Sequence, residues 1–506
     1  MASFMLAVDQ GTTSTRAVIY DEAGQQVSSG QKEHRQIFAN PGWVEHDATE
    51  IWANTREVIG MALAKANLTR HHIAGVGITD QRETTVVWDK RTGKPLAPAL
   101  VWQDTRTQEF VKAHEADGLA TAIKDITGLP LTTYFSVSKL AWILDNVPET
   151  RLLAEQGDAL FGTIDSWLLW NLTGGVDGGV HATDVTNASR TGLMDIYQCA
   201  WSEELCQELN IPLPMLPEIK PSSGNFGICH DAQLLRDVPI TGILGDQQAA
   251  TFGQSVFEPG AAKNTYGTGC FFNMITGSAP VFSTEGLLTT VAYQLEGQKP
   301  VYGLEGSVAV AGSLIQWLRD NLGLISTSSE VEELAASVPD NGGVYFVPAF
   351  SGLFAPYWRP EARGAIQGLT RFATKAHIAR AALESTAFQV HDVVASVQSE
   401  KLGDTGDLKE IRVDGGMSVN DGLMQFQADV LNFDVVRPQN VETTSLGAAF
   451  AAGLAVGFWK DLNTLRSLWK EERRFTPNMD AARRKEYLGR WNRAVGNTVG
   501  WLEPLD

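Results

Sequence analysis

The amino-acid sequence predicts an α/β protein made of two similar halves that face each other across a cleft. A turn rich in glycine and hydroxyl side chains joins two short apolar strands at residues 5–20, and a similar pattern returns at residues 262–275. In addition, buried strands alternate with amphipathic helices, as in doubly wound α/β folds. A chain of 506 residues is also too long for one hydrophobic core, so two large domains are expected.

The overall composition limits the partners of the chain. The sequence is 43% hydrophobic and 20% charged, as in globular proteins, and its net charge of −19 argues against nucleic acid or an anionic membrane as a partner. A nucleotide triphosphate is still compatible, because glycine-rich backbone and a bound cation can hold its charge locally. No apolar run has membrane-spanning length, and the first residues lack a basic leader, so we expect neither a membrane segment nor a signal peptide. The four cysteines form no CxxC pair, which favours a reducing cytoplasm over a disulfide framework or a zinc site.

The first hairpin belongs to a predicted β-meander over residues 5–27. Its turn, residues 9–16, offers many NH and OH donors, and Gly11 allows the backbone to turn tightly around phosphate oxygens. Arg16 can add positive charge, and Asp9 can hold Mg²⁺ directly or through water. A polar hairpin loop without a ligand explains this stretch equally well when it is considered alone.

The next elements continue the α/β pattern. Residues 47–50, Asp-Ala-Thr-Glu, predict a helix N-terminus of the capping-box type, and apolar residues recur at helical spacing over residues 51–63. A buried strand is expected at residues 73–78. Arg82 and Glu83 follow its end, where a loop would let both reach one small polar ligand. A surface charge pair is the alternative, and for these two residues in isolation it is the better one.

Two aromatic residues are ambiguous. Trp102 follows the apolar run 99–101, and Tyr134 opens a predicted helix that continues to Leu144. Considered alone, both would be assigned to the core. Residues 183–190 are polar and compact, and no role follows from their sequence.

A strand that ends at Gly245 leads into a helix of small residues, and Asp246 lies at this corner. In open α/β sheets, ligands bind at the carboxyl ends of strands. Asp246 could be a helix cap, or it could be a general base with Gln247 hydrogen-bonding the same substrate.

The second hairpin differs from known phosphate motifs. Residues 267–269, Gly-Thr-Gly, are not a dinucleotide fingerprint, because Phe272 occupies the third glycine position and no helix follows. A Walker A sequence is also absent. Phosphate binding in this chain would therefore use the paired hairpins.

The remaining elements are mostly helical. Helices are expected at residues 308–318 and 376–397. Between a strand and a further helix, Gly415–Gly416 would let a flat ring or a phosphate lie close to the backbone, with Asn420 supplying an amide. A simple tight turn is equally compatible with this sequence. The tail after Lys460 is charged, and we expect it to be peripheral.

Several motifs resemble one known family. Residues 134–143, Tyr-Phe-Ser-Val-Ser-Lys-Leu-Ala-Trp-Ile, are similar to the first signature of the FGGY carbohydrate kinases, and residues 364–369, continuing to 377–384, fit the second. These kinases belong to the actin/hexokinase-like ATPase superfamily. The motifs typical of the members that phosphorylate glycerol lie at residues 41–47, 80–85 and 245–249. The resemblance covers essentially the whole chain.

The resemblance implies two duplicated actin-like/ribonuclease H-like domains around a central cleft. Residues 1–253 would bind mainly substrate, with a phosphate-binding hairpin, and residues 254–506 mainly nucleotide. The implied reaction is ATP-dependent phosphorylation of glycerol to sn-glycerol 3-phosphate, with in-line transfer of the γ-phosphoryl group. A kinase for another small polyol or ketose of the same family is the alternative, and a non-catalytic nucleotide switch is a more distant one. Hinge closure would complete the site, and the family forms homodimers and homotetramers.

The resemblance also assigns site residues. The implied glycerol pocket consists of Arg82, Glu83, Trp102, Tyr134, Asp246, Gln247 and Phe271. The implied ATP contacts are Thr12, Thr13, Ser14, Arg16, Thr268, Gly312, Gln316, Gly416 and Asn420. Asp246 and Arg16 would be catalytic, and Asp9 and Asp246 would lie near Mg²⁺.

Two regulatory motifs of bacterial relatives are missing. Some relatives carry a glycine-rich fructose bisphosphate loop in this region, and others carry a phosphorylatable histidine in a His-Phe-Tyr-Gly context. Residues 227–236 fit neither pattern, so we predict insensitivity to both controls, with His230 a surface histidine.

Overall fold

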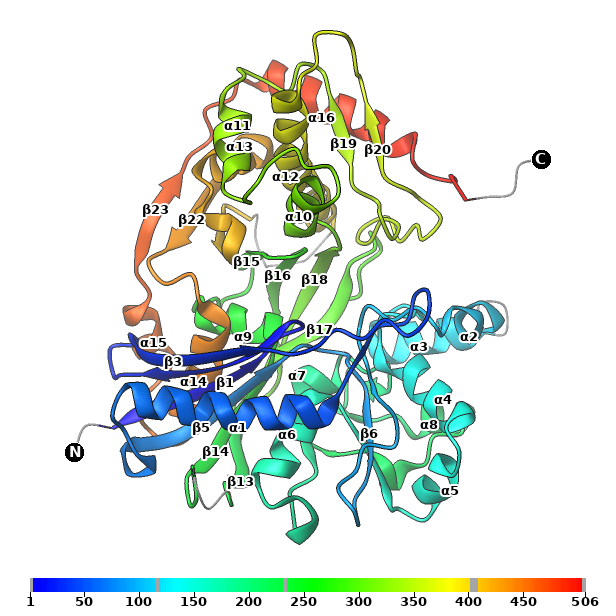
Figure 1. Cartoon of the computed structure of the whole chain (residues 1–506), viewed down its shortest axis with the longest axis vertical. Coiled ribbons are helices and arrows are strands. Elements are labelled where there is room, and N and C mark those ends of the chain that lie inside the picture. The colour runs from blue at the N-terminus through cyan, green and yellow to red at the C-terminus, as the bar shows by residue number, and fades with distance from the viewer. Residues whose placement is uncertain (1–2, 115–117, 231–233, 401–407, 503–506) are drawn as a thin grey trace.

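The computed structural model describes residues 3–114, 118–230, 234–400 and 408–502 (Figure 1). The stretch 227–236, for which we predict no regulatory motif, is therefore described only in part, and residues 231–233 lie outside the described residues. Within the described part, no helix combines the length and the apolar character needed to cross a membrane.

The first half is built on a six-stranded sheet in the order β13-β14-β5-β1-β2-β3. Its strands are β1 (Phe4–Gln10), β2 (Ser14–Tyr20), β3 (Gln26–Glu33), β5 (Ile73–Asp80), β13 (Ser223–Ile228) and β14 (Pro239–Gly245). The strands β1, β2 and β3 form the expected antiparallel meander, whereas β14, β5 and β1 run parallel. This sheet therefore combines a meander with parallel strands whose carboxyl ends lie at one edge.

The second half repeats this arrangement in a seven-stranded sheet, in the order β17-β18-β16-β15-β21-β22-β23. Its strands are β15 (Ala262–Tyr266), β16 (Cys270–Gly277), β17 (Leu288–Tyr293), β18 (Val301–Val308), β21 (Glu410–Asp414), β22 (Asp434–Pro438) and β23 (Glu471–Phe475). The first strand, β15, again pairs antiparallel with its hairpin partner and parallel with a later strand, β21. The predicted duplication of an α/β unit is confirmed.

Two helices fill the space between the sheets, α9 (Asp246–Gly253) and α14 (Thr443–Ala455), as Figure 1 shows. They share one hydrophobic cluster with residues of β1, β16 and β17. The two helices approach so closely that a Cβ atom on Gly447 would lie 1.8 Å from the carbonyl oxygen of Ala249, so only glycine fits there. Helix α14 thus joins the C-terminal part of the chain to the first sheet.

The outer faces are covered by further helices. Helices α1 (Ala48–Lys65) and α6 (Ile164–Leu172) pack on the first sheet, and α12 (Lys375–Ser399) and α13 (Asp421–Leu431) pack on the second. Asp47 caps α1 as predicted, accepting hydrogen bonds from the backbone of Thr49 and Glu50. The described contacts contain no reciprocal bond from Glu50 to the cap, and its carboxylate accepts instead from Arg35.

Further helices and strands complete both halves. In the first half they are β4 (Glu45–His46), β6 (Val86–Asp89), β7 (Ala99–Leu100), α2 (Gln108–Ala113), α3 (Leu119–Thr127), α4 (Ser136–Asn146), α5 (Thr150–Glu155), β8 (Ala159–Gly162), β9 (Ala182–Asp184), α7 (Val185–Ala188), β10 (Met194–Asp195), β11 (Ala200–Trp201), α8 (Glu203–Glu208) and β12 (Glu218–Lys220). In the second half they are α10 (Gly312–Asp320), α11 (Glu330–Ala336), β19 (Tyr345–Val347), β20 (Ala365–Gln367), α15 (Leu462–Leu468) and α16 (Ala481–Gly496).

Two expected helix starts are wrong. The helix expected at residues 308–318 begins only at Gly312, because Val308 still pairs with Cys270 in the second sheet. The helix expected to open at Tyr134 begins at Ser136. The charged tail lies at the edge of the second half, as expected, but part of it also joins the core. Strand β23 extends the second sheet, and α16 buries Trp491, whose ring stacks on Phe388 at 5.2 Å between centroids. The many charged residues of α16 obscure its buried apolar residues in the sequence.

Candidate active site

The candidate site begins at the carboxyl ends of β1, β5 and β14. In the pairing register, Asp9 of β1 lies opposite Thr79, while Asp80 lies opposite both Gln10 and Gly245. The residues that follow these strands, Arg82 and Asp246 among them, are therefore brought to the same edge of the sheet.

Asp246 is the first residue of α9, and Gly245 occupies the cap position. Its Oδ1 accepts hydrogen bonds from the backbone NH of Gln247 at 2.7 Å and faces Nε of Arg82 at 3.2 Å. Burial raises the pKa of this carboxyl, and the positive charges of Arg82 and Lys263 oppose that rise. The side chain is still 31% exposed, so a ligand can reach it. The bond from the NH of Gln247 is a contact at the helix N-terminus, so the structure is compatible with the helix-cap alternative as well as with a general base.

Arg82 and Glu83 are buried charges, which excludes the surface-pair alternative. Both guanidinium Nη atoms of Arg82 contact Glu305 of β18, at 2.5 and 2.9 Å, and Nη1 also donates to Gln248. Glu83 has a left-handed backbone with φ of 63°, and such a conformation in a buried non-glycine residue is typical of functional sites. Its Oε1 accepts from Nε of Arg190 at 2.7 Å.

The aromatic residues of the predicted pocket meet as a wall. The ring of Trp102 lies edge-on to Tyr134 and to Phe271, with centroids 5.6 and 6.4 Å apart. Phe271 comes from the second sheet, so the wall spans both halves. Phe354, which the sequence did not indicate, contacts Tyr134 at 6.0 Å between centroids.

Gln247 is held by a lysine that sequence reasoning missed. The Nζ of Lys263 donates to Oε1 of Gln247 at 2.7 Å and to Oγ1 of Thr265 at 2.8 Å, and it lies 3.3 Å from the carbonyl oxygen of Phe271. Burial lowers the pKa of Lys263 to about 8, although nearby carboxylates act to raise it. This lysine links the predicted amide ligand to the aromatic wall.

The first hairpin contains the predicted phosphate contacts. Its turn is closed by a bond from the NH of Gly11 to the carbonyl oxygen of Ser14 at 2.9 Å. Thr13 is exposed, and the Oγ1 of Thr12 accepts from the indole NH of Trp102 at 3.0 Å. The hairpin is thus joined directly to the aromatic wall.

Arg16 is paired in this structure rather than free. Its Nη2 contacts Asp9 at 3.2 Å and also Glu442, which precedes α14. Burial raises the pKa of Asp9, with Arg16 acting in the opposite direction. A phosphate at the hairpin would therefore compete with two carboxylates for Arg16.

The second hairpin lies against the start of α10. The carbonyl oxygens of Gly267 and Thr268 accept from the backbone NH groups of Gly312 and Ala311, at 3.0 and 2.9 Å. A Cβ atom on Gly312 would lie 2.6 Å from the Gly267 carbonyl oxygen, which explains the glycine. The Thr268 side chain is exposed, as a phosphate contact requires.

The other residues predicted to contact the nucleotide, Gly416, Asn420 and Gln316, each border solvent or a cavity. A Cβ atom on Gly416 would meet no atom within 4 Å, so the turn leaves room for a ligand. Asn420 caps α13, because its Oδ1 accepts from the NH of Leu423 at 2.8 Å. It also lines a cavity of about 340 Å³ between α11, α12 and α13. Gln316 is exposed on α10.

Mg²⁺ fits the donor set at Asp9 and Asp246. The described residues contain no cluster of three His, Cys, Asp or Glu side chains that could enclose a metal. Mg²⁺, however, keeps several waters and uses one or two carboxylates together with substrate phosphates. Burial is the main cause that raises the pKa of Asp9, and the charge of Asp246 adds to that rise, which a cation held by the two carboxylates would counteract.

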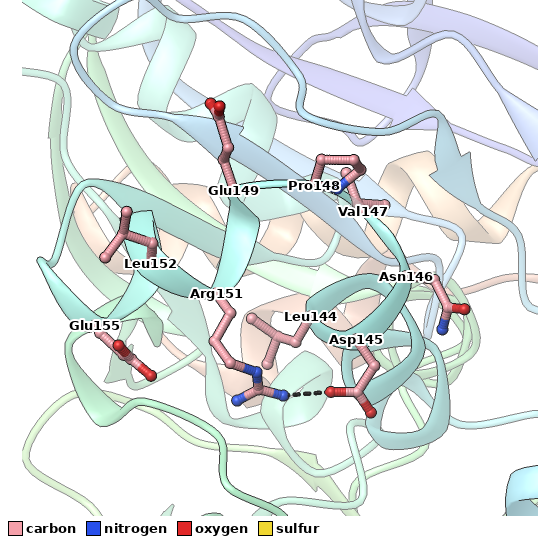
Figure 2. Close-up of a pocket in the computed structure, with 9 residues that line it drawn as sticks. All are labelled: Leu144, Asp145, Asn146, Val147, Pro148, Glu149, Arg151, Leu152 and Glu155. Atoms are coloured by element: carbon pink, nitrogen blue, oxygen red, sulfur yellow. Dashed lines mark hydrogen bonds and ion pairs between the residues drawn. The ribbon is translucent and has the colours of Figure 1, made fainter.

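Figure 2 shows a different cavity, of about 510 Å³, on the outside of the first half. It lies between α4 and α5, and Arg151 bridges to Asp145 at 2.5 Å on its wall. None of the residues that line it belongs to the predicted site, and we assign it no role.

Sequence reasoning missed Arg190, Lys263 and Glu305. A signal existed for Glu305, because a carboxylate in the middle of an almost entirely buried strand requires a partner. The partner itself could not be identified from sequence. Arg190 lies in the polar stretch 183–190, for which the sequence suggested no role.

Comparison with known proteins identifies similar sequences over nearly the whole chain. Models of the N-terminal and C-terminal domains of the FGGY family of carbohydrate kinases match residues 4–253 and 262–456. The chain is 62% identical over 504 residues to a glycerol kinase of Pseudarthrobacter chlorophenolicus, covering 99% of each chain, and 61% identical to that of Leifsonia xyli over the same shares.

Solved structures give the same picture. The Plasmodium falciparum glycerol kinase with ADP superposes with a TM-score of 0.89 at 42% identity, covering 98% of each chain. A xylulose kinase from Lactobacillus acidophilus has a TM-score of 0.86 at 23% identity, covering 98% of this chain and 97% of that one, which shows a shared fold.

Proposed function

The chain belongs to the FGGY family of carbohydrate kinases, and from this premise we propose that it transfers the γ-phosphoryl group of ATP to glycerol, forming sn-glycerol 3-phosphate. The observation that carries the proposal is that the side chains predicted to bind the acceptor lie together. The polar groups, Arg82, Glu83 and Asp246, lie at one edge of the first sheet, and the aromatic wall comes from both halves. The full-length relatives named above are glycerol kinases, which supports the same acceptor.

The pocket suits a short polyol. Arg82, Glu83 and Gln247 can hydrogen-bond hydroxyl groups, while Trp102 and Phe271 offer apolar surface to the carbon chain. Because a buried polar group left without a partner is costly, an acceptor that lacks one hydroxyl should be used poorly. An acceptor longer than the wall allows should be excluded by steric contact.

Asp246 is the proposed general base. Its exposed carboxylate oxygen would accept the proton of the primary hydroxyl as that oxygen attacks the γ-phosphorus in line. Arg82 holds the other oxygen of the same carboxylate at 3.2 Å, which fixes its direction. Such positioning supplies most of the catalysis in phosphoryl transfer.

The two hairpins would hold the triphosphate. Thr12, Thr13 and Ser14 would contact it from the first half and Thr268 from the second. Arg16 would turn from Glu442 to the transferred group and offset its charge. Asp9 and Asp246 would hold Mg²⁺, which when bound offsets negative charge on the phosphate oxygens. Gly312, Gln316, Gly416 and Asn420 would flank the rest of the nucleotide.

The family resemblance also supports broader proposals. We assign residues 1–253 mainly to acceptor binding and residues 254–506 mainly to nucleotide binding. Closure of the halves would exclude water from the site. We expect a cytoplasmic homodimer or homotetramer.

The proposal is tested by ADP production from MgATP with glycerol, dihydroxyacetone, erythritol or xylulose, with an assay lacking acceptor as the control. We expect the highest kcat/KM with glycerol. A preference for erythritol or xylulose would show that glycerol is not the main acceptor, but it would leave the assignment as a kinase unchanged. Equal ADP production with and without every acceptor would refute the kinase and favour a nucleotide switch.

A further inference from the structure

We propose that Arg190 and Glu305 are positioning residues, which complete a closed ring of four buried charges with Arg82 and Glu83 and thereby orient the acceptor site. This inference deepens the proposed function and rests on it. The two new members of the ring come from distant parts of the chain, the polar stretch after α7 and the strand β18.

The ring is continuous in the structure. Glu305 receives both Nη atoms of Arg82, at 2.5 and 2.9 Å, and Nη2 of Arg190 at 3.0 Å. Arg190 in turn donates from Nε to Oε1 of Glu83 at 2.7 Å. The circuit closes between Glu83 and Nε of Arg82, at 3.9 Å. Positive and negative groups alternate around it, so its formal charge is zero.

Burial makes the members depend on one another. All four side chains are 0–2% exposed. Removing one partner of a buried ion pair leaves an uncompensated charge, which is far more costly than losing a surface pair. The ring therefore holds its members in one arrangement.

This arrangement decides which atoms remain for the acceptor. Glu305 grips the two Nη atoms of Arg82 in a fork, which turns Nε toward Asp246. Arg190 occupies Oε1 of Glu83, and within the described residues the structure gives Oε2 of Glu83 no hydrogen bond. Glu305 thus binds the two Nη atoms of Arg82, and Arg190 binds Oε1 of Glu83. This leaves Oε2 of Glu83 for the substrate, while Nε of Arg82 faces Asp246, the proposed base.

The ring also affects the charge of Glu83. Burial raises the pKa of Glu83, and Arg82 and Arg190 counteract that rise. Glu305 faces two guanidinium groups, so although burial alone would raise its pKa, Arg190 and Arg82 lower it to about 2. Without Arg190, Glu83 should therefore take up a proton at a higher pH and lose its ability to accept a hydroxyl hydrogen bond.

The Arg190 contacts also extend to the aromatic wall. Its guanidinium lies 5.8 Å from the ring centroid of Tyr134 and 5.2 Å from that of Phe135. Ser307 donates to Oε1 of Glu305 at 3.2 Å from the same strand. Because Glu305 belongs to the second sheet, the ring fixes the acceptor groups relative to both halves.

The test compares Arg190→Gln, Arg190→Lys and Glu305→Gln with wild type in the holoenzyme, measuring kcat and KM for glycerol and for MgATP across a pH series. We expect Arg190→Gln and Glu305→Gln to raise KM for glycerol by roughly 10- to 100-fold, the effect of losing one hydrogen bond to a charged group. For Arg190→Gln, the acid limb of kcat/KM for glycerol should move to higher pH. Arg190→Lys keeps the charge and should recover part of both effects, while KM for MgATP stays constant.

Asp392→Asn is the matched control. Asp392 is also a buried carboxylate, and it accepts from the indole of Trp491 at 2.7 Å and the hydroxyl of Tyr357 at 2.9 Å, outside the ring. This variant should lower the melting temperature without changing KM for glycerol or the pH profile. If Arg190→Gln behaves like Asp392→Asn, the ring is only structural and the inference is wrong.

A double-mutant cycle with Glu83→Gln isolates the coupling. If Arg190 acts through Glu83, adding Arg190→Gln to Glu83→Gln should raise KM little further, whereas additive effects would overturn the inference. Should Arg190→Gln fail to fold, Arg190→Lys and Glu305→Gln carry the same comparison. Wild-type turnover tests the proposed function separately, because the variant ratios are taken with whichever acceptor the wild type uses best.

Discussion

Asp246→Asn tests the proposed chemistry most directly, because the structure predicts which hydrogen bonds the variant retains. The side-chain oxygen of asparagine can still accept from the NH of Gln247, at the position where Oδ1 now lies 2.7 Å away, and from Nε of Arg82. The shape of the site should therefore be retained. Only the negative charge and the proton-accepting oxygen are removed.

The magnitude follows from these contacts. Proton transfer by a positioned side chain is worth about 10²- to 10⁴-fold, so kcat should fall by that factor. KM for glycerol should change little, since Arg82, Glu83 and Gln247 keep their partners. The stability change should stay below about 1 kcal/mol, because the carboxylate is 31% exposed and Arg82 retains Glu305.

The assay measures ADP production at saturating glycerol and MgATP, together with thermal unfolding. Asp392→Asn makes the same chemical change in a buried carboxylate of α12 and serves as the control. A kcat for Asp246→Asn within tenfold of wild type would refute the general-base role. A melting temperature that falls as far as in the control would show that the side chain is mainly structural.

The remaining predictions concern pH, packing and regulation. Because burial raises the pKa of Asp246, and a base must be deprotonated, kcat/KM should fall on acidification at a pH above the ordinary aspartate value of 3.8; a limb at or below that value would contradict this. Gly447→Ala should destabilise by about 1–3 kcal/mol or more, since its Cβ would lie 1.8 Å from the backbone oxygen of Ala249. Gly489→Ala, which meets no atom within 4 Å in α16, should instead stabilise by roughly 0.5–1 kcal/mol, and thermal unfolding of both variants checks the pair. Because residues 227–236 lack both regulatory motifs, millimolar fructose 1,6-bisphosphate should leave glycerol turnover unchanged, and sustained inhibition would disprove it.

Local features of the chain were predictable because their causes are local. The hairpin around Gly11 and the strand-to-helix corner at Asp246 follow from residues adjacent in sequence, and the structure has both. The cap of α1 by Asp47 is another such case. The boundary at Gly312 was predicted wrongly, because pairing between Val308 and Cys270, far apart in sequence, extended a strand into the expected helix.

The sequence by itself determined the duplicated α/β plan, since turn chemistry and apolar periodicity are written in neighbouring positions, and its short motifs led to the residues proposed to bind the acceptor. Only the tertiary structure decided what holds those residues. Arg82 meets Glu305 across 223 positions of sequence, and Arg190 meets Glu83 across 107. Such contacts leave no local pattern, because an ion pair depends on distance in space, and the folding of two sheets around α9 and α14 sets that distance.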